Sequence, residues 1–525
     1  MLKETPINKT FVKVGAAFAV LALGLGTLTG CTGDDEDSGK PAKITMMVLG
    51  DKPSNGRYEA MLKVLNARLT EQANATLDLH YIEWADWQTQ YNVQLLSGDS
   101  TVDLITTATD WLFAWENAQK GAFLPLSEDM LKKNAPKTWE QVNASGDWDL
   151  TKLDDGQIQF IPEDDYTQWT NHGFFYRGDW AKAAGIPDGT VTKFEQFTQY
   201  FTWVKKNKPK AYPWDIAKAN ESALTGYLQG HSDWFTLQEV TAGTSFPFQI
   251  DNSGATPKVT SWYYSSDEFI AAAKQAKQWN DLGVWREDAL NYDGDPREEF
   301  YAGLSGTDQH HTQTFVGDIV NNMTKKQPGS DPKMFSFGQE NGNIYKDIKT
   351  HGAMAVAANS KHPEKALAVY DLIRNDKTDY DLLNFGIQGT DYVLAADGKI
   401  DYPKGYDSSK DALGTNFWGG RRDQFEPGKV TDAPNKAEIF KSLDAVGKVY
   451  PFSTLRVKKD QIDPTITAVG GVLSEYIPQL EYGKKADPAA AIAEMRQKLK
   501  DAGFEDALKS IQADLDTWSK THKAK

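Results

Sequence analysis

Residues 44–49 read ITMMVL, an unbroken apolar run that predicts a buried β-strand. The amphipathic stretch over about 58–72 predicts a helix, and residues 77–82 alternate as a second strand. Residues 87–96 predict another helix, and residues 102–106 predict a third strand. This β-α-β-α-β order implies an α/β fold, in which a parallel sheet carries helices on its faces.

The carboxyl ends of these three strands are the expected ligand side of the sheet, because ligands of such sheets bind beyond that edge. The ends fall at residues 50–51, 83–84 and 107–111. Two of the three ends carry a Trp and two carry an Asp. The sequence therefore concentrates aromatic and acidic side chains where a ligand would sit.

The N-terminal segment is typical of an exported lipoprotein. A basic start precedes an apolar stretch over 14–25, which is too short and too rich in Gly and Ala for a membrane span. The run LTGC at 28–31 resembles a lipobox and ends in the only cysteine of the chain. We expect residues 1–30 to be a signal peptide and Cys31 to carry lipid at the outer face of a membrane. An ordinary secretory signal followed by an incidental cysteine is the alternative.

Composition narrows the class of partner. A chain of 525 residues should form at least two domains. We expect a monomer, and its single cysteine excludes a disulfide within the chain. The formal charge of −16 argues against nucleic acid and anionic membrane surfaces as partners. The 16 Trp, 21 Tyr and 24 Phe favour flat, partly polar ligands, although most of these rings will serve the core.

The remaining chain is mixed in pattern. Residues 31–42 form an acidic segment rich in polar residues that predicts a flexible tether after the cysteine. Two amphipathic helices separated by Ala502 and Gly503 are expected over 488–518. Further helices are expected near residues 192–206, 267–282, 363–373 and 464–480.

Several short segments, taken in their order along the chain, indicate a known family of proteins. They are SGD followed by VDLI within 97–105, GAFLPL at 121–126, GQIQFIP at 156–162, FYRGDW at 175–180, HPEKA at 362–366 and NFGIQG at 384–389. Together they resemble the extracellular solute-binding proteins of bacterial carbohydrate ABC transporters, in particular the lipoproteins related to alginate-oligosaccharide-binding proteins. The calcium loop of the alginate binders is not evident, because residues 206–212 are basic and lack spaced Asp and Asn ligands.

The resemblance implies a two-lobe fold of the type II periplasmic-binding-protein kind, with hinge strands and a ligand cleft between the lobes. It also implies a binding protein, not an enzyme, that closes on an oligosaccharide and delivers it to an ABC transporter permease. The expected divisions are lobe 1 over 43–162, lobe 2 over 163–305, a return to lobe 1 over 306–355, and the remainder of lobe 2 with the C-terminal helices over 356–525.

Candidate ligand contacts follow from the chemistry of sugars. Indoles stack on the apolar faces of sugar rings, carboxylates accept bonds from hydroxyls, and arginine donates bidentate bonds. For each residue, packing or a solvated loop is the alternative. The candidates are Trp84, Asp110, Trp111, Glu163, Asp165, Trp169, Trp234, Gln309, His310, Trp418 and Arg421.

Two other functions stay open. A lipid-anchored glycoside hydrolase or lyase could use paired carboxylates such as Glu163 and Asp165. A transporter component of the same fold could bind peptides or lipids instead of sugars. No cofactor or metal is expected, because His310 and His311 are adjacent and would point to opposite faces of a strand. The calcium-like run that starts at Asn291 has Pro296 where the loop needs glycine.

Overall fold

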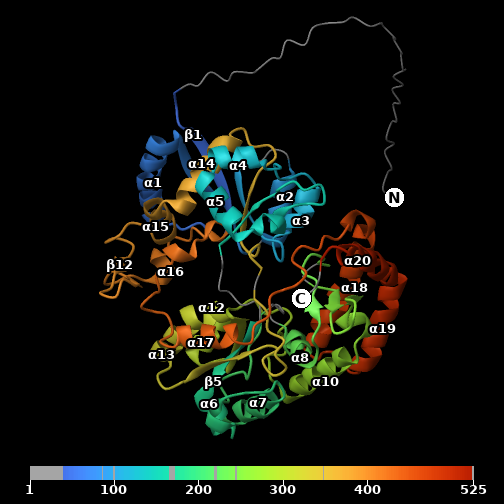
Figure 1. The fold of residues 1–525 in the computed structure, drawn as a ribbon. Coiled ribbons are helices and arrows are strands. Elements are labelled where there is room, and N and C mark those ends of the chain that lie inside the picture. The colour runs from blue at the N-terminus through green and yellow to red at the C-terminus, as the bar shows by residue number, and fades with distance from the viewer. Residues whose placement is uncertain are drawn as a thin grey trace, which may run out of the picture. The chain divides into compact units, whose positions relative to one another are not determined.

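The computed structural model describes residues 39–85, 87–97, 101–164, 172–217, 222–242, 245–346 and 348–522. Residues 41–525 form one compact unit, shown as a ribbon in Figure 1. The predicted signal peptide, Cys31 and most of the tether lie outside the described residues. None of the described helices is long and apolar enough to cross a membrane.

Lobe 1 is built on a five-stranded sheet with the order β2-β1-β3-β11-β4. The parallel core of the sheet is β1 (Ala42–Leu49) between β2 (Ala75–Ile82) and β3 (Leu104–Thr107). β11 (Ala353–Val356) then runs antiparallel to both β3 and β4 (Ile161–Pro162). The parallel arrangement predicted for the first three strands is therefore confirmed, and a strand from far along the chain completes the sheet.

Helices cover both faces of this sheet because each presents one apolar stripe to it. On one face, α1 buries five side chains and α14 contacts both β1 and β2. On the other face, α2 and α3 contribute Tyr91 and Trp115 to a second cluster with Met47 and Leu49 of β1. Figure 1 shows α1 and α14 beside β1. The elements of lobe 1 outside the sheet are α1 (Arg57–Ala73), α2 (Trp87–Leu96), α3 (Ala114–Gln119), α4 (Glu128–Asn134), α5 (Pro136–Ser145), η1 (Asp147–Thr151), α14 (Pro363–Asn375), α15 (Lys377–Phe385), β12 (Val393–Leu394), β13 (Ile400–Asp401), α16 (Ser408–Asp411), η4 (Trp418–Gly420) and η5 (Asp423–Phe425).

Lobe 2 contains two small antiparallel sheets within a mainly helical body. One sheet has the order β10-β5-β9, formed by β5 (His172–Arg177), β9 (Thr307–His311) and β10 (Pro332–Ser336). The other sheet joins β6 (Phe235–Thr236), β7 (Gln249–Asp251) and β8 (Lys258–Thr260). A large aromatic core, which includes Phe174, Trp214 and Trp279, lies between the first sheet and the helices.

The helices of lobe 2 include the C-terminal group, in which α18 contacts both α19 and α20 (Figure 1). Those three helices supply Leu473, Ile492 and Leu515 to the aromatic core. The full set is α6 (Gly178–Ala183), η2 (Pro187–Gly189), α7 (Gln196–Asn207), α8 (Ala223–His231), α9 (Trp262–Ser265), α10 (Asp267–Leu282), α11 (Pro296–Ala302), α12 (Thr312–Thr314), the π-helical turn η3 (Phe315–Ile319), α13 (Val320–Lys326), α17 (Lys436–Asp444), η6 (Lys459–Gln461), α18 (Asp463–Glu481), α19 (Pro488–Asp501) and α20 (Phe504–Trp518).

Strand pairing corrects two of the expected lobe boundaries. Residues 306–355 were expected in lobe 1, but β9 and β10 both pair with β5 in lobe 2. Residues 356–525 were expected in lobe 2, but α14 packs on the lobe 1 sheet and η4 packs against β11. A hydrophobic pattern identifies a strand without indicating which sheet it joins. The chain returns to lobe 2 at Ala433, just before α17.

Helix positions are predicted more closely than lobe membership. The helices expected near 192–206, 267–282, 363–373 and 464–480 correspond to α7, α10, α14 and α18. The two C-terminal helices are divided at Ala502 and Gly503, as expected, and Gly503 adopts a positive φ of 87°. These segments are strongly periodic, which is why their ends are readable from the sequence.

Glu481 lies at the end of α18, and its carboxyl group is buried. The Ser222 hydroxyl donates a hydrogen bond to it, and burial raises its pKa to about 7. Since the folded pKa lies above the ordinary value of 4.5, this group stabilises the fold below pH 4.5 and loses that contribution as pH rises through 7. We expect Glu481→Gln to gain about 2–3 kcal/mol of unfolding free energy relative to wild type between pH 5 and pH 8. Urea unfolding at the two pH values measures this.

The matched control is Glu475→Gln, which removes an exposed carboxylate from the same helix. It should leave the pH dependence of stability unchanged. Parallel stability curves for Glu481→Gln and wild type across this pH range would contradict the prediction.

Candidate ligand-binding site

Four indoles gather beyond the carboxyl ends of β2 and β3. The ring centroids of Trp84 and Trp418 lie 5.8 Å apart, as do those of Trp111 and Trp418, and Trp87 lies 5.7 Å from Trp111. Trp84 keeps 42% of its surface exposed, whereas the other three are half-buried. The group, called here the indole cluster, thus offers an aromatic surface to solvent where the sequence predicted one.

Trp418 reaches the cluster from a distant part of the chain because of a close backbone approach. A Cβ atom on Gly419 would lie 2.2 Å from the Ala353 carbonyl oxygen of β11, so only glycine lets η4 rest on the sheet there. Asn416 donates from Nδ2 to the Leu49 carbonyl at the end of β1, at 2.7 Å. These two contacts fix η4 to the edge of the sheet at which the indoles meet.

Asp110 provides a hydrogen-bond acceptor beside the indoles. Its Oδ2 lies 2.7 Å from Nδ1 of His351, and the Trp111 Nε1–H donates to the His351 carbonyl at 2.9 Å. Among the described residues, nothing donates a hydrogen bond to the buried Oδ1 of Asp110. A buried acceptor of this kind favours a partner from a ligand, since leaving it unbonded costs about 1–3 kcal/mol.

Glu163 lies directly after β4, at the point where the chain leaves the lobe 1 sheet. Its side chain is buried, and its Oε1 accepts the Gly352 backbone N–H at 3.0 Å. Its own N–H donates to the Gly352 carbonyl at 3.0 Å, so the two segments are bonded in both directions. The position is that of a hinge contact rather than an open acceptor. Asp165 and Trp169 lie outside the described residues.

The lobe 2 candidates Gln309 and His310 lie on β9. Gln309 is buried and accepts the Ser222 backbone N–H at 3.1 Å. His310 Nδ1 lies 2.8 Å from the Thr314 hydroxyl, and its ring lies 5.3 Å from that of His172 and 4.1 Å from that of His311. Two imidazoles of β9, those of His310 and His311, and that of His172 at the start of β5 therefore form a group of three where the two strands pair.

These imidazoles are neutral at physiological pH. The His172 side chain is exposed on one side, yet desolvation by the neighbouring protein, together with the charges of His351 and Arg297, lowers its pKa to about 4. Burial also lowers the pKa of His310 and of His311, with neighbouring positive charge adding to the effect. The charge of His351 is among the causes that lower the pKa of His172 and of His311. The Asp110–His351 pair of lobe 1 and the histidines of lobe 2 therefore interact electrostatically.

The remaining candidates, Trp234 and Arg421, contact neighbouring residues of their own lobe. Trp234 packs against the lobe 2 core instead of joining the indole cluster. Arg421 follows η4, with its Nε 3.6 Å from an Asp423 carboxylate oxygen. Trp115 is buried, with its ring centroid 4.8 Å from that of Phe160.

A narrow crevice beside Asp110 and Trp111 is lined from both lobes. Lobe 2 supplies Arg456 next to it, whose guanidinium lies 3.7 Å from the Trp115 ring and donates to the Lys152 carbonyl at 3.1 Å. Arg456 also pairs with Glu239 at 3.2 Å. No sequence pattern marks His351, Asn416 or Arg456. The crevice is lined by Thr109, Asp110, Trp111, Phe113, Trp115, Gln238, Glu239, Thr241 and Lys459.

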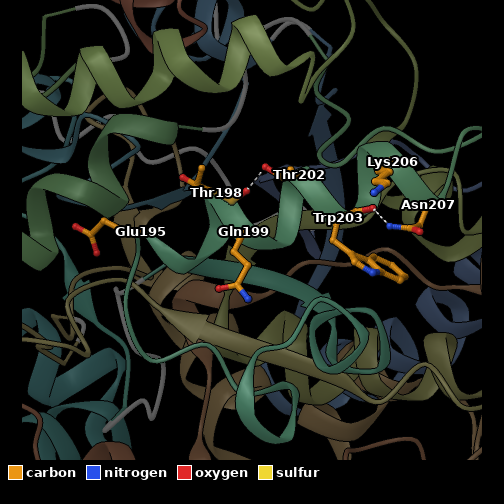
Figure 2. A pocket seen from close by; sticks show the side chains of 7 residues that line it. All are labelled: Glu195, Thr198, Gln199, Thr202, Trp203, Lys206 and Asn207. Atoms are coloured by element: carbon orange, nitrogen blue, oxygen red, sulfur yellow. Dashed lines mark hydrogen bonds between the residues drawn. The ribbon is translucent and has the colours of Figure 1, made fainter.

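A second hollow lies on the outer face of α7, and Figure 2 shows its side chains along that one helix. The Thr202 hydroxyl donates to the Thr198 carbonyl at 2.7 Å, and Asn207 Nδ2 donates to the Trp203 carbonyl at 2.8 Å. The hydrogen bonds of Thr202 and Asn207 are thus satisfied within the helix, which leaves these two groups less suited to hold a ligand.

The sequence comparison gives the family. The profile described as "Bacterial extracellular solute-binding protein" matches residues 52–379, which is more than half of the chain. The chain belongs to the bacterial extracellular solute-binding proteins. A second profile, a domain of unknown function named DUF3502, matches residues 456–520, the segment that contains α18–α20.

Three relatives span almost the whole chain. A carbohydrate ABC transporter substrate-binding protein of Streptococcus pneumoniae serotype 4 (strain ATCC BAA-334 / TIGR4) is 24% identical over 98% of this chain and 99% of its own. The crystal structure of the N-glycan transport solute-binding protein NgtS of Streptococcus pneumoniae, in complex with Man1GlcNAc, has a TM-score of 0.71 at 20% identity and covers 91% of this chain and 100% of that one. The alginate-binding protein AlgQ2, solved without calcium ion, has a TM-score of 0.66 at 18% identity over 91% of this chain and 98% of its own. The two-lobe fold of the solute-binding proteins is thereby confirmed.

Gly419→Ala tests whether the close approach of η4 to β11 holds the indole cluster together. The added methyl group must displace η4 from the Ala353 carbonyl, so we expect a loss of about 1–3 kcal/mol of unfolding free energy. Movement of Trp418 should also change the near-ultraviolet circular dichroism of the coupled indoles. Urea unfolding and the dichroism spectrum measure the two effects.

The control is Gly471→Ala in α18, where an added Cβ meets nothing within 4 Å. It should be neutral or stabilising by up to about 1 kcal/mol, because alanine favours the helix. A Gly419→Ala protein with wild-type stability and an unchanged spectrum would show that η4 does not depend on this contact.

Proposed function

We propose that this protein captures an oligosaccharide in the crevice between its lobes and delivers it to the permease of an ABC transporter. The observation that carries the proposal is the unbonded Oδ1 of Asp110 beside the half-exposed indole cluster, at a crevice lined from both lobes. An aromatic surface with an adjacent acceptor matches a sugar ring, whose faces are apolar and whose edges carry hydroxyls.

The relatives support a carbohydrate ligand. NgtS is an N-glycan transport solute-binding protein whose structure contains Man1GlcNAc, and AlgQ2 is an alginate-binding protein. The curated relative is named for a carbohydrate ABC transporter. Oligosaccharide is therefore the class that we assign to this chain, ahead of a peptide or a lipid.

Lobe closure supplies the binding mechanism. A ligand that touches Trp111 from lobe 1 and the Gln238–Thr241 segment from lobe 2 makes its full set of contacts only when the lobes approach. Such contacts shift the population of lobe arrangements toward the closed one. The neutral imidazoles of His172 and His310 can both donate to and accept from sugar hydroxyls on the lobe 2 side.

The proposal also covers where the protein is located and whether it catalyses a reaction. The sequence pattern at Cys31 supports a lipid anchor at the outer face of the cell membrane, where a monomer would work beside its permease. Binding without catalysis is favoured over glycoside cleavage, because the Glu163 carboxylate is buried and bonded to the Gly352 backbone. Mass spectrometry of the N-terminal peptide tests the anchor, since an unmodified Cys31 would contradict it.

The experiment that tests the function is a thermal-shift screen of the chain without residues 1–31 against defined oligosaccharides. A ligand present at a hundred times its Kd adds about 2.7 kcal/mol of stability. We expect a rise in Tm with one class of glycan and none with peptides. A rise with peptides alone, or product formation from a glycan, would replace this proposal with one of the alternatives.

Replacing Trp418 or Trp84 with alanine removes one stacking surface of the indole cluster. We expect each variant to bind its oligosaccharide at least tenfold more weakly, in line with a loss of about 1–3 kcal/mol per stacked ring. Isothermal titration calorimetry with the sugar found by the screen measures the change.

The control variant is Trp203→Ala, which removes a half-buried indole from α7 in the outer hollow (Figure 2). Its affinity should match that of wild type. Equal affinities for Trp418→Ala, Trp84→Ala and Trp203→Ala would exclude the indole cluster as the sugar-binding surface.

A further inference from the structure

Three side chains of lobe 2 converge outside the crevice. Glu195 directly precedes α7, His231 ends α8, and Glu340 lies in the loop after β10. One ligand atom from each lies within 4.8 Å of the other two, and within the described ranges no other group of three or more His, Cys, Asp or Glu residues meets this condition. None of the three lines the crevice. They therefore form a cluster that the proposed function does not use.

The hydrogen bonding of His231 fixes which ring nitrogen is available. Its Nδ1 lies 2.8 Å from the Tyr227 carbonyl oxygen, which can only accept, so Nδ1 carries the proton that is donated. The ring also stacks on Tyr227, with centroids 3.9 Å apart and an angle of 5° between the planes. In the neutral imidazole, Nε2 then presents its lone pair to the cluster.

That lone pair faces a carboxylate. Nε2 of His231 lies 2.9 Å from Oε1 of Glu195, so two acceptors oppose each other unless a proton or a metal ion lies between them. A histidine whose Nδ1–H donates to a backbone carbonyl while Nε2 faces an acidic group is the arrangement that orients metal-binding imidazoles.

Glu340 supplies the third donor. Its Oε2 accepts the Phe194 backbone N–H at 3.2 Å, while its buried Oε1 accepts no hydrogen bond from the described residues. Burial raises the pKa of this carboxyl, which a neighbouring cation would offset. A Cβ atom on Gly230 would lie 2.1 Å from Oε1 of Glu340 and would displace this carboxylate oxygen from its position. The glycine thus leaves room for the carboxylate against the last turn of α8.

We propose that Glu195, His231 and Glu340 form a binding site for Zn²⁺. One imidazole nitrogen and two carboxylate oxygens suit this ion, and three protein ligands leave a fourth tetrahedral position for water. The two carboxylates balance the charge of the ion. Ca²⁺ is the poorer match, because it takes six to eight oxygen ligands. The ion would join the start of α7, the end of α8 and the loop after β10, three segments of lobe 2 that come from separate parts of the chain.

The test uses the full exported chain freed of metal with a chelator. We expect one Zn²⁺ per chain by titration calorimetry, a rise in Tm with ZnCl₂, and no comparable rise with CaCl₂ or MgCl₂. Co²⁺ in place of Zn²⁺ should give the visible absorption of a tetrahedral site. Both Glu340→Gln and His231→Gln should weaken Zn²⁺ binding at least tenfold.

Two controls keep the outcome decisive. His362→Gln removes an exposed histidine from the start of α14 in lobe 1 and should leave Zn²⁺ binding unchanged. The circular dichroism of each variant should match wild type, which shows that a loss of binding is not a loss of fold. Wild-type Zn²⁺ binding in both Glu340→Gln and His231→Gln would overturn the site. The absence of any Zn²⁺-dependent rise in Tm would also overturn it and leave His231 paired with Glu195 alone.

Discussion

The insertion of β11 into the lobe 1 sheet is the constraint on which the candidate ligand site depends. β11 lies between β3 and β4, and its backbone meets three separate segments at Ala353: Thr107 of β3, Pro162 of β4, and Gly419 of η4. The two residues before it reach Asp110 through His351 and Glu163 through Gly352. One short strand thereby positions the indole of Trp418, the acceptor of Asp110 and the hinge contact.

Arg456 of lobe 2 forms an electrostatic connection between the two lobes. Arg456 is buried between the Trp115 ring, two carbonyl oxygens of lobe 1 and the Glu239 carboxylate of lobe 2. A buried guanidinium of this kind needs all of its partners, because removing one leaves a charge in a medium of low dielectric. Two contacts of this arginine, Trp115 and Glu239, line the crevice together with Trp111 of the indole cluster. In the proposed function, recognition of a flat, hydroxylated ligand would combine stacking on the indoles with a few directed hydrogen bonds.

Much of this arrangement is readable from the sequence. The strand at 44–49 and the helices and strands that follow it are predicted in their correct order, as are Trp84, Asp110 and Trp111 at the strand ends. These predictions hold because hydrophobic periodicity is local. The lobe boundaries after residue 305 are not predicted, because pairing of β9 with β5 and of β11 with β3 joins residues more than a hundred positions apart. Asn416 and His351 are missed for the same reason, since their roles depend on where the sheet brings them. The placement of Asp165 and Trp169 stays a prediction.

The discontinuous sheet of lobe 1 also governs the order in which the protein can fold. β3 has an open edge until residues 353–356 arrive, so the first lobe cannot close its sheet while only its N-terminal 162 residues have been made or moved across a membrane. Pairing between segments this distant slows folding, because a long loop must close before the contact forms. For a chain that crosses a membrane before it folds, this delay is useful. The sheet of lobe 1 stays incomplete until β11 is available, and the indole cluster, which includes Trp418, is completed only after that.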